Sequence, residues 1–192
     1  MKSLNTPAKV QDFLNSLKFN FEEKEETLKS PILTLRALRA HCIEGAILGA
    51  YILSLHGFKP LILHLQTIKE DFDHVIVPFK QYGFWGALSK TNHAVLRYRE
   101  PIYKNIRELI MSYFHEYFLS NGRKTLRKYS KPLNLNMFKK GWEKEENNLW
   151  VIDKKLDKIK HYDIAPKIVF KNLRKADKVE IKAGNIVEFK KY

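Results

Sequence analysis

The chain has 192 residues, of which 44% are hydrophobic and 29% are charged. This length fits one folded domain, and the composition excludes extended disorder, a collagen-like repeat and a disulfide-stapled miniprotein. The net charge of +14 falls mostly in residues 101–192, which carry 22 lysines and arginines against 11 acidic residues. The single cysteine cannot form an internal disulfide and fits a reducing compartment.

The sequence also indicates the compartment of the protein and the kind of partner it could bind. Residues 1–13 hold no apolar core of signal-peptide length, and the apolar stretch 42–55 is too short to span a bilayer. We therefore expect a cytoplasmic protein with no membrane partner. The basic second half would attract anions such as nucleic acid, and Tyr129 in the basic run 123–131 could stack on a base. No nucleic-acid motif accompanies this charge, and a solvated lysine-rich surface explains it as well.

The first forty residues contain two sequence signals for the start of a helix. Thr6-Pro7 and Ser30-Pro31 each pair a capping side chain with a proline that suits the first helical turn. The first predicts a short helix, and the second leads into a helical pattern over residues 33–55 with a break near Ala40-His41. The charged segment 21–29 is expected to be an exposed connector.

The second helical pattern carries a stripe of small residues, namely Gly45, Ala46, Gly49 and Ala50. Each glycine costs a helix up to about 1 kcal/mol relative to alanine. We expect the close approach of another element to offset that cost. The helix is expected to stop at Gly57.

The hydrophobic period changes after Gly57. Residues 61–65, 73–79 and 84–88 form short apolar runs, and residues 80–83 fit a tight turn between the last two. Antiparallel strands that follow a helix predict an α+β fold. A helical pattern then returns over residues 102–119.

The remainder of the chain is read as short strands. A turn over residues 183–185 fits a hairpin. We therefore expect a core over residues 1–132 and a basic α/β C-terminal extension over residues 133–192, packed on that core. The strands expected in the extension are 149–152, 167–170, 179–181 and 186–189.

Cys42 and His74 are the residues best suited to chemistry. Cys42 begins the small-residue helix, where the positive end of the helix dipole favours a thiolate, the species that attacks carbonyl carbons. A lone cysteine also fits a buried apolar position. His74 begins a strand 32 residues later, beside Asp73, and an acidic neighbour favours an imidazolium. A thiolate–imidazolium pair is the activated state of cysteine hydrolases.

The order of these elements resembles the transglutaminase-like superfamily. Cys42 heads a helix that leaves through Leu53-Ser54-Leu55-His56-Gly57, His74 opens a strand, and Trp85 lies on the next strand. The resemblance covers about residues 30–120. It implies a cysteine helix packed on an antiparallel β-sheet, a peptide or protein amide substrate, and no cofactor.

The third member of the catalytic set departs from the family. The family places an aspartate four residues after the tryptophan, and that position is Ser89 here. A serine can accept a hydrogen bond from the imidazole but carries no charge. Asn92 could orient the histidine as asparagine does in papain-like proteases, and we place it slightly ahead of Ser89.

Other polar residues near this core are candidates for substrate binding. His41 and Glu44 flank the cysteine, Trp85 lies on the neighbouring strand, and Lys90 and His93 lie in a polar loop. No metal site is expected, because the histidines and acids near His74 lack the helical spacing of zinc hydrolases.

The sequence therefore leaves three candidate functions. The first is a transglutaminase-like cysteine hydrolase or acyltransferase that acts on an amide or thioester through Cys42 and His74. The second is a catalytically inactive peptide-binding module of the same fold, which the missing aspartate favours. The third is a basic nucleic-acid-binding protein.

Overall fold

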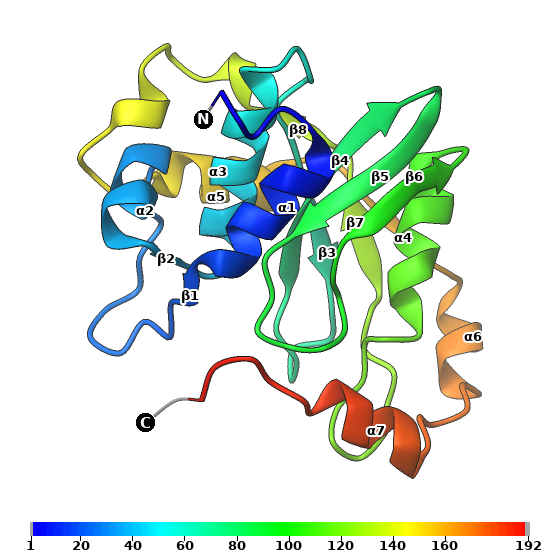
Figure 1. The fold of residues 1–192 in the computed structure, drawn as a ribbon. Coiled ribbons are helices and arrows are strands. Elements are labelled where there is room, and N and C mark those ends of the chain that lie inside the picture. The colour runs from blue at the N-terminus through cyan, green and yellow to red at the C-terminus, as the bar shows by residue number, and fades with distance from the viewer. Residues whose placement is uncertain (1, 191–192) are drawn as a thin grey trace.

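The computed structural model describes residues 2–190 (Figure 1). The helices are α1 (Pro7–Ser16), α2 (Pro31–Ala37), α3 (Cys42–Ser54), α4 (Ile106–Phe114), α5 (Trp150–Lys158), α6 (Lys167–Lys171) and α7 (Lys178–Gly184), with short 3-10 turns η1 (Leu135–Met137) and η2 (Trp142–Lys144). The strands are β1 (Lys18–Phe19), β2 (Arg39–Ala40), β3 (Leu61–Gln66), β4 (His74–Gln81), β5 (Phe84–Ser89), β6 (Arg99–Tyr103), β7 (Lys128–Ser130), β8 (Leu133–Asn134) and β9 (His161–Asp163). Together they form a mixed α+β fold.

A seven-stranded sheet forms the centre of the molecule. Its order is β6-β5-β4-β3-β7-β9, and β8 pairs with the other end of β3. All its pairings are antiparallel. A separate parallel pair, β1 and β2, lies just before α3 and directs the chain into that helix.

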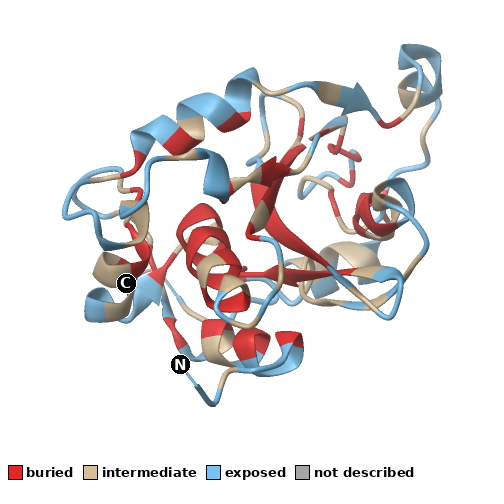
Figure 2. Ribbon diagram, turned by 90° about the horizontal axis from the view of Figure 1, so that it is seen from above, coloured by how far each residue is buried: buried red, intermediate tan, exposed pale blue. Residues whose placement is uncertain are grey.

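Both faces of the sheet are covered by apolar side chains. On β3, Ile62 belongs to the cluster that contains α1, α3 and α5, whereas Leu63 and Leu65 belong to the cluster around α4. This alternation follows from the two-residue period of a strand. Helix α3 is buried along almost its whole length (Figure 2), which explains its apolar composition.

The N-terminal predictions are confirmed. The side chain of Thr6 caps α1 and the side chain of Ser30 caps α2. A break separates α2 from α3, and a hairpin joins β4 to β5. The small-residue stripe allows close packing, because a Cβ added to Gly45 would collide with the Cβ of Lys90.

The prediction for residues 102–119 is wrong at both ends. Residues 99–103 form β6, and α4 begins only after Asn105, whose side chain accepts a hydrogen bond from the Glu108 N–H. The helix ends at Phe114. The segment 123–136 also contains β7 and β8, which are not among the strands expected from the sequence.

Three of the four strands predicted after residue 145 are wrong, since residues 149–152, 167–170 and 179–181 fall at α5, α6 and α7. The fourth segment, 186–189, is not helical, but its bridge pairs Val187 with His93 and not with residues 179–181, so the predicted hairpin does not form. A short apolar run does not distinguish a strand from a helix turn. In α5 the buried Leu149, Ile152 and Leu156 are spaced for one helical face. In α7, Asp177 caps the helix and the Glu180 side chain completes a capping box.

Elements β8, α5 and β9 share the sheet and core of the preceding chain. Strand β8 pairs with β3 and β9 pairs with β7. Leu149, Ile152 and Leu156 pack in the same cluster as α1 and α3. Across residues 2–190, no helix combines the length and apolar character that a membrane crossing requires.

Candidate active site

The sulfur of Cys42 lies at the first turn of α3, where the short β1–β2 pair delivers the chain. His41 precedes the helix in an extended conformation, and its N–H donates to the Glu44 carboxylate at 3.2 Å. Cys42 is only partly buried and its thiol is free. The sulfur therefore lies at the positive end of the helix dipole.

His74, the first residue of β4, is hydrogen-bonded to both Cys42 and Ser89. Its Nε2 lies 2.7 Å from the Ser89 hydroxyl oxygen, and its ring also bonds the cysteine. The Ser89 hydroxyl donates to the Leu96 carbonyl, so its oxygen accepts from a protonated Nε2. This leaves Nδ1 of the ring to face the sulfur.

His41 provides a second imidazole at the sulfur. Its Nε2 lies 2.9 Å from the carbonyl oxygen of Thr27, which can only accept a hydrogen bond. The ring also interacts with the Cys42 thiol and with the Glu44 carboxylate, whose Oε2 lies 3.6 Å from Nε2, and both interactions favour the protonated ring.

The pKa values of this pair agree with the hydrogen bonding. Burial opposes ionisation of the Cys42 thiol, but hydrogen bonds and positive charge from His41 and His74 outweigh it and lower the pKa from 9.0 to about 5. Burial also opposes charge on His41, yet the hydrogen bond to Cys42 and the charges of the thiolate and Glu44 raise its pKa to about 9. At neutral pH the site therefore holds a thiolate and an imidazolium.

Glu44 supports His41 from below. Its side chain is fully buried, and its oxygens accept from the Thr27 hydroxyl at 2.7 Å and from the Lys29 ammonium at 2.8 Å. Asn20 donates to the other oxygen at 3.1 Å. Burial alone would raise the Glu44 pKa, but His41 and these donors lower it. The carboxylate thus orders the connector around the site, which corrects the substrate-binding role expected for it.

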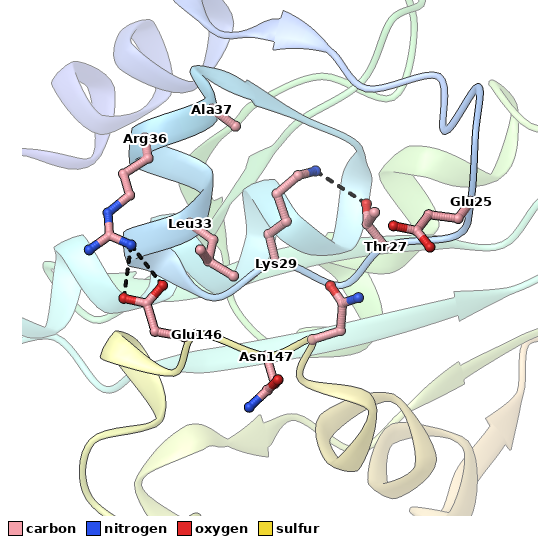
Figure 3. A pocket seen from close by; sticks show the side chains of 9 residues that line it. Glu25, Thr27, Lys29, Leu33, Arg36, Ala37, Glu146 and Asn147 are labelled. Atoms are coloured by element: carbon pink, nitrogen blue, oxygen red, sulfur yellow. Dashed lines mark hydrogen bonds and ion pairs between the residues drawn. The ribbon is translucent and has the colours of Figure 1, made fainter.

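A cavity of about 540 Å³ lies behind this connector (Figure 3). Thr27 and Lys29 line it, and the dashed line between them marks their hydrogen bond of 3.2 Å. Arg36 and Glu146 form an ion pair at its rim. Cys42 does not line this cavity. The cavity therefore adjoins the hydrogen-bond network that supports the site, and not the sulfur itself.

Ser89 is fixed by a residue that sequence analysis did not identify. The Gln11 side chain of α1 donates to the Ser89 carbonyl at 2.8 Å and accepts from the Ser89 N–H at 2.9 Å. The available sequence signal was a polar residue between apolar positions of a short helix. Gln11 is buried, and its two bonds hold the end of β5 beside His74.

Leu96 and Glu116 complete the support of Ser89. Leu96 has a φ of 61°, in the left-handed region, and its carbonyl accepts from Ser89. Its N–H donates to the Glu116 carboxylate at 2.6 Å, and the same carboxylate bonds Arg99 at 2.7 Å. A strained backbone position that serves a functional side chain is a frequent feature of active sites.

Asn92 and Lys90 are used elsewhere. The Asn92 side chain bonds the backbone of Phe189, so Ser89 and not Asn92 contacts the His74 ring. Lys90 is 1% exposed and its ammonium donates to the Leu17 carbonyl, while burial lowers its pKa to about 8. A substrate role for Lys90 therefore does not fit.

Trp85 and His93 are also placed away from the sulfur. Trp85 pairs with Lys80 on β4, at the opposite end of the strand from His74, and lines a different cavity of about 510 Å³. His93 bonds the carbonyl of Gly184 at 3.0 Å. Neither residue is assigned to the site.

No family model matches this chain, and no curated protein matches it.

Some residues of the basic run 123–131, and of the histidines and acids near His74, make contacts within the protein. Lys124 is buried and donates to the His115 carbonyl, and Arg127 stacks on Phe170. His64 bonds Asp73 at 2.9 Å. Among residues 2–190, no three histidine, cysteine or acidic side chains are grouped so as to hold a metal.

Proposed function

We propose that the protein is a transglutaminase-like cysteine hydrolase or acyltransferase that acts on an amide or thioester. The observation that carries this proposal is the arrangement of the site: Cys42 begins α3, His74 is oriented by Ser89 at 2.7 Å, and the imidazoles of His41 and His74 lower the pKa of the Cys42 thiol to about 5 against the effect of burial. An inert structural cysteine gains nothing from such an arrangement, whereas a nucleophile requires it.

The proposed reaction has two steps. In the first step the Cys42 sulfur attacks the carbonyl carbon of an amide and forms a thioester with the enzyme. The C–N bond breaks as the leaving amine takes the proton that the thiol gave to His74. The Cys42 N–H at the helix start helps to hold the oxyanion. His74 then removes a proton from water or an acceptor amine, which attacks the thioester and releases the sulfur. Water gives a hydrolase, and an amine gives a transferase.

The two histidines divide the work in this proposal. His74 exchanges the proton, because its Nδ1 faces the sulfur and Ser89 holds its other nitrogen. His41 keeps its charge, since its pKa is about 9, and stabilises the thiolate before attack. Stabilisation of the thiolate would thus come from a cation beside the nucleophile, and neutral Ser89 would orient the base at the position where the family has an aspartate.

Acylation of Cys42 tests the proposal. Wild-type protein mixed with p-nitrophenyl acetate should release nitrophenol in a burst of one equivalent, and intact mass should show one acetyl group at Cys42. His74→Ala should acylate and turn over far more slowly, while Cys42→Ala should show no burst. Acylation no faster than that of free cysteine would reject the enzyme.

A second candidate, a peptide-binding module without catalysis, is favoured by one observation. The residue that orients His74 is an uncharged serine, whose hydroxyl donates to a backbone carbonyl. This orients the ring but adds no negative charge to stabilise an imidazolium at His74. The acylation experiment separates the two candidates, because the module would bind peptide and form no acyl adduct.

A further inference from the structure

Residues 185–190, here called the strap, cross the loop that follows Ser89. Ile186 accepts from the Ala94 N–H at 2.9 Å, and the Glu188 N–H donates to the Asn92 carbonyl at 2.8 Å. Val187 and His93 form an antiparallel bridge between these two bonds. The strap therefore lies on residues 92–94, here called the docking edge, in the manner of an added β-strand.

The side chain of Asn92 recognises the backbone of the strap. Its Nδ2 donates to the Phe189 carbonyl at 2.9 Å, and its Oδ1 accepts from the Phe189 N–H at 2.8 Å. One amide group thus pairs with both polar groups of one residue. Such contacts read an extended backbone and do not depend on the side chains it carries.

The docking edge continues directly into the candidate active site. The ammonium of Lys90 lies 5.5 Å from the centre of the Phe189 ring. The stem of Lys90 packs on Gly45, one helical turn from Cys42. The Lys90 side chain therefore connects the end of the strap to the first turns of α3, which begins at Cys42.

The strap buries little apolar surface, although it makes several hydrogen bonds. Ile186 and Val187 are 58% and 37% exposed, so little apolar area holds it in place. The ion pair between Arg97 and Glu188, at 3.3 Å, is partly exposed and contributes little. A segment that buries little apolar area opens at a lower cost in free energy than the core strands do.

We propose that the docking edge is a binding site for the backbone of an extended peptide, and that the strap occupies this site in cis. The binding part stands on the contacts alone, while its role as a substrate site for Cys42 rests on the proposed function. The class of ligand is an unfolded or extended polypeptide segment, recognised through main-chain pairing with residues 92–94.

A displacement experiment in the full chain tests this proposal. All variants carry Cys42→Ala, so that binding is measured without chemistry. Glu188→Pro removes the N–H that bonds Asn92, whereas Glu188→Ala keeps this N–H and loses only the ion pair with Arg97. The probe is a fluorescein-labelled peptide of residues 183–190, followed by fluorescence anisotropy.

The peptide should bind the Glu188→Pro protein at least tenfold more tightly than the Glu188→Ala protein or the parent. Adding Asn92→Ala to Glu188→Pro should abolish this gain. Equal binding to all variants, or no binding to folded Glu188→Pro protein, would overturn the proposal. A failed acylation assay would leave this result unaffected, because these proteins lack the nucleophile.

Hydrogen exchange in the parent provides a second measurement that needs no proline. The amide of Phe189 should be protected, and Asn92→Ala should raise its exchange rate at least tenfold while core amides of β4 stay unchanged. An unprotected Phe189 amide in the parent, or one that Asn92→Ala does not affect, would contradict the docking of the strap.

Discussion

His74 and Ser89 are joined by a hydrogen bond of 2.7 Å between Nε2 and Oγ, and this bond determines which nitrogen of the ring faces Cys42. Ser89 is itself fixed by Gln11 from α1 and by the carbonyl of Leu96. The orientation of the proposed base therefore depends on residues from three separate parts of the chain.

Ser89→Ala should slow turnover with p-nitrophenyl acetate about tenfold, because a lost buried hydrogen bond costs about 1–2 kcal/mol. The thiolate should persist, since His41 remains beside Cys42. Ser54→Ala is the matched control: its hydroxyl bonds Tyr51 at the far end of α3, and turnover should not change. An equal loss in both variants would contradict the role of Ser89.

Stability should fall as the pH drops from 6.5 to 5. The Cys42 pKa is lowered, so its contribution is complete above 9.0 and is lost as the pH falls through 5. The His41 pKa is raised, so its contribution is complete below 6.5 and is lost as the pH rises through 9. Between pH 6.5 and 9 the two slopes cancel, and below 6.5 only the cysteine slope remains.

The measurement is the free energy of unfolding in urea, compared between wild type and Cys42→Ser at each pH. The difference should shrink by about 1–2 kcal/mol between pH 6.5 and 5. The difference reports Cys42 together with the part of the His41 pKa that depends on it, and a constant difference would mean that Cys42 is not ionised in the folded state.

Glu44→Gln should destabilise the protein by about 2–4 kcal/mol, because it leaves the ammonium of Lys29 poorly paired beside a buried amide. The same change removes a negative charge beside His41, so the His41 pKa should fall below 9. Urea unfolding and NMR titration measure the two effects. The control is Glu146→Gln, whose exposed pair with Arg36 should contribute less than about 1 kcal/mol.

Gly45→Ala should destabilise the protein by about 1–3 kcal/mol in urea unfolding, since the new Cβ would collide with the stem of Lys90. Gly49→Ala is the comparison. There the new Cβ would meet methyl groups of Leu14 and Leu88 at 3.1 Å, which can shift, and the gain in helix propensity offsets part of the strain. A Gly45→Ala protein as stable as wild type would show that Lys90 is free to move.

Local signals in the sequence predicted the elements that position the nucleophile. Thr6 and Ser30 cap helices because their hydroxyls satisfy free N–H groups, a rule that needs no tertiary context. The placement of Cys42 at a helix start and His74 at a strand start followed from the hydrophobic period. Their contact is a tertiary fact, predicted only through the order of the elements.

The supporting residues could not be predicted from the sequence. Gln11 bonds Ser89, which lies 78 positions later in the sequence. Glu44 accepts hydrogen bonds from the connector 21–29, which was expected to be exposed. Nothing in a local pattern distinguishes such side chains from ordinary polar residues. The helices after residue 145 were missed for a different reason: their apolar runs are too short to show a helical period, and in α5 only the packing of Ile152 and Leu156 reveals it.

The rate of Cys42 alkylation by iodoacetamide as a function of pH shows directly whether the sulfur is a thiolate at neutral pH. We expect a midpoint near pH 5, with a rate at pH 6 about ten- to thirtyfold above that of a free thiol after allowance for the weaker nucleophilicity of a low-pKa thiolate. In His41→Ala the midpoint should move upward, and in His115→Ala it should stay. A wild-type midpoint near pH 9, with a rate at pH 6 no higher than that of free cysteine, would mean that Cys42 is an ordinary thiol and not an activated nucleophile.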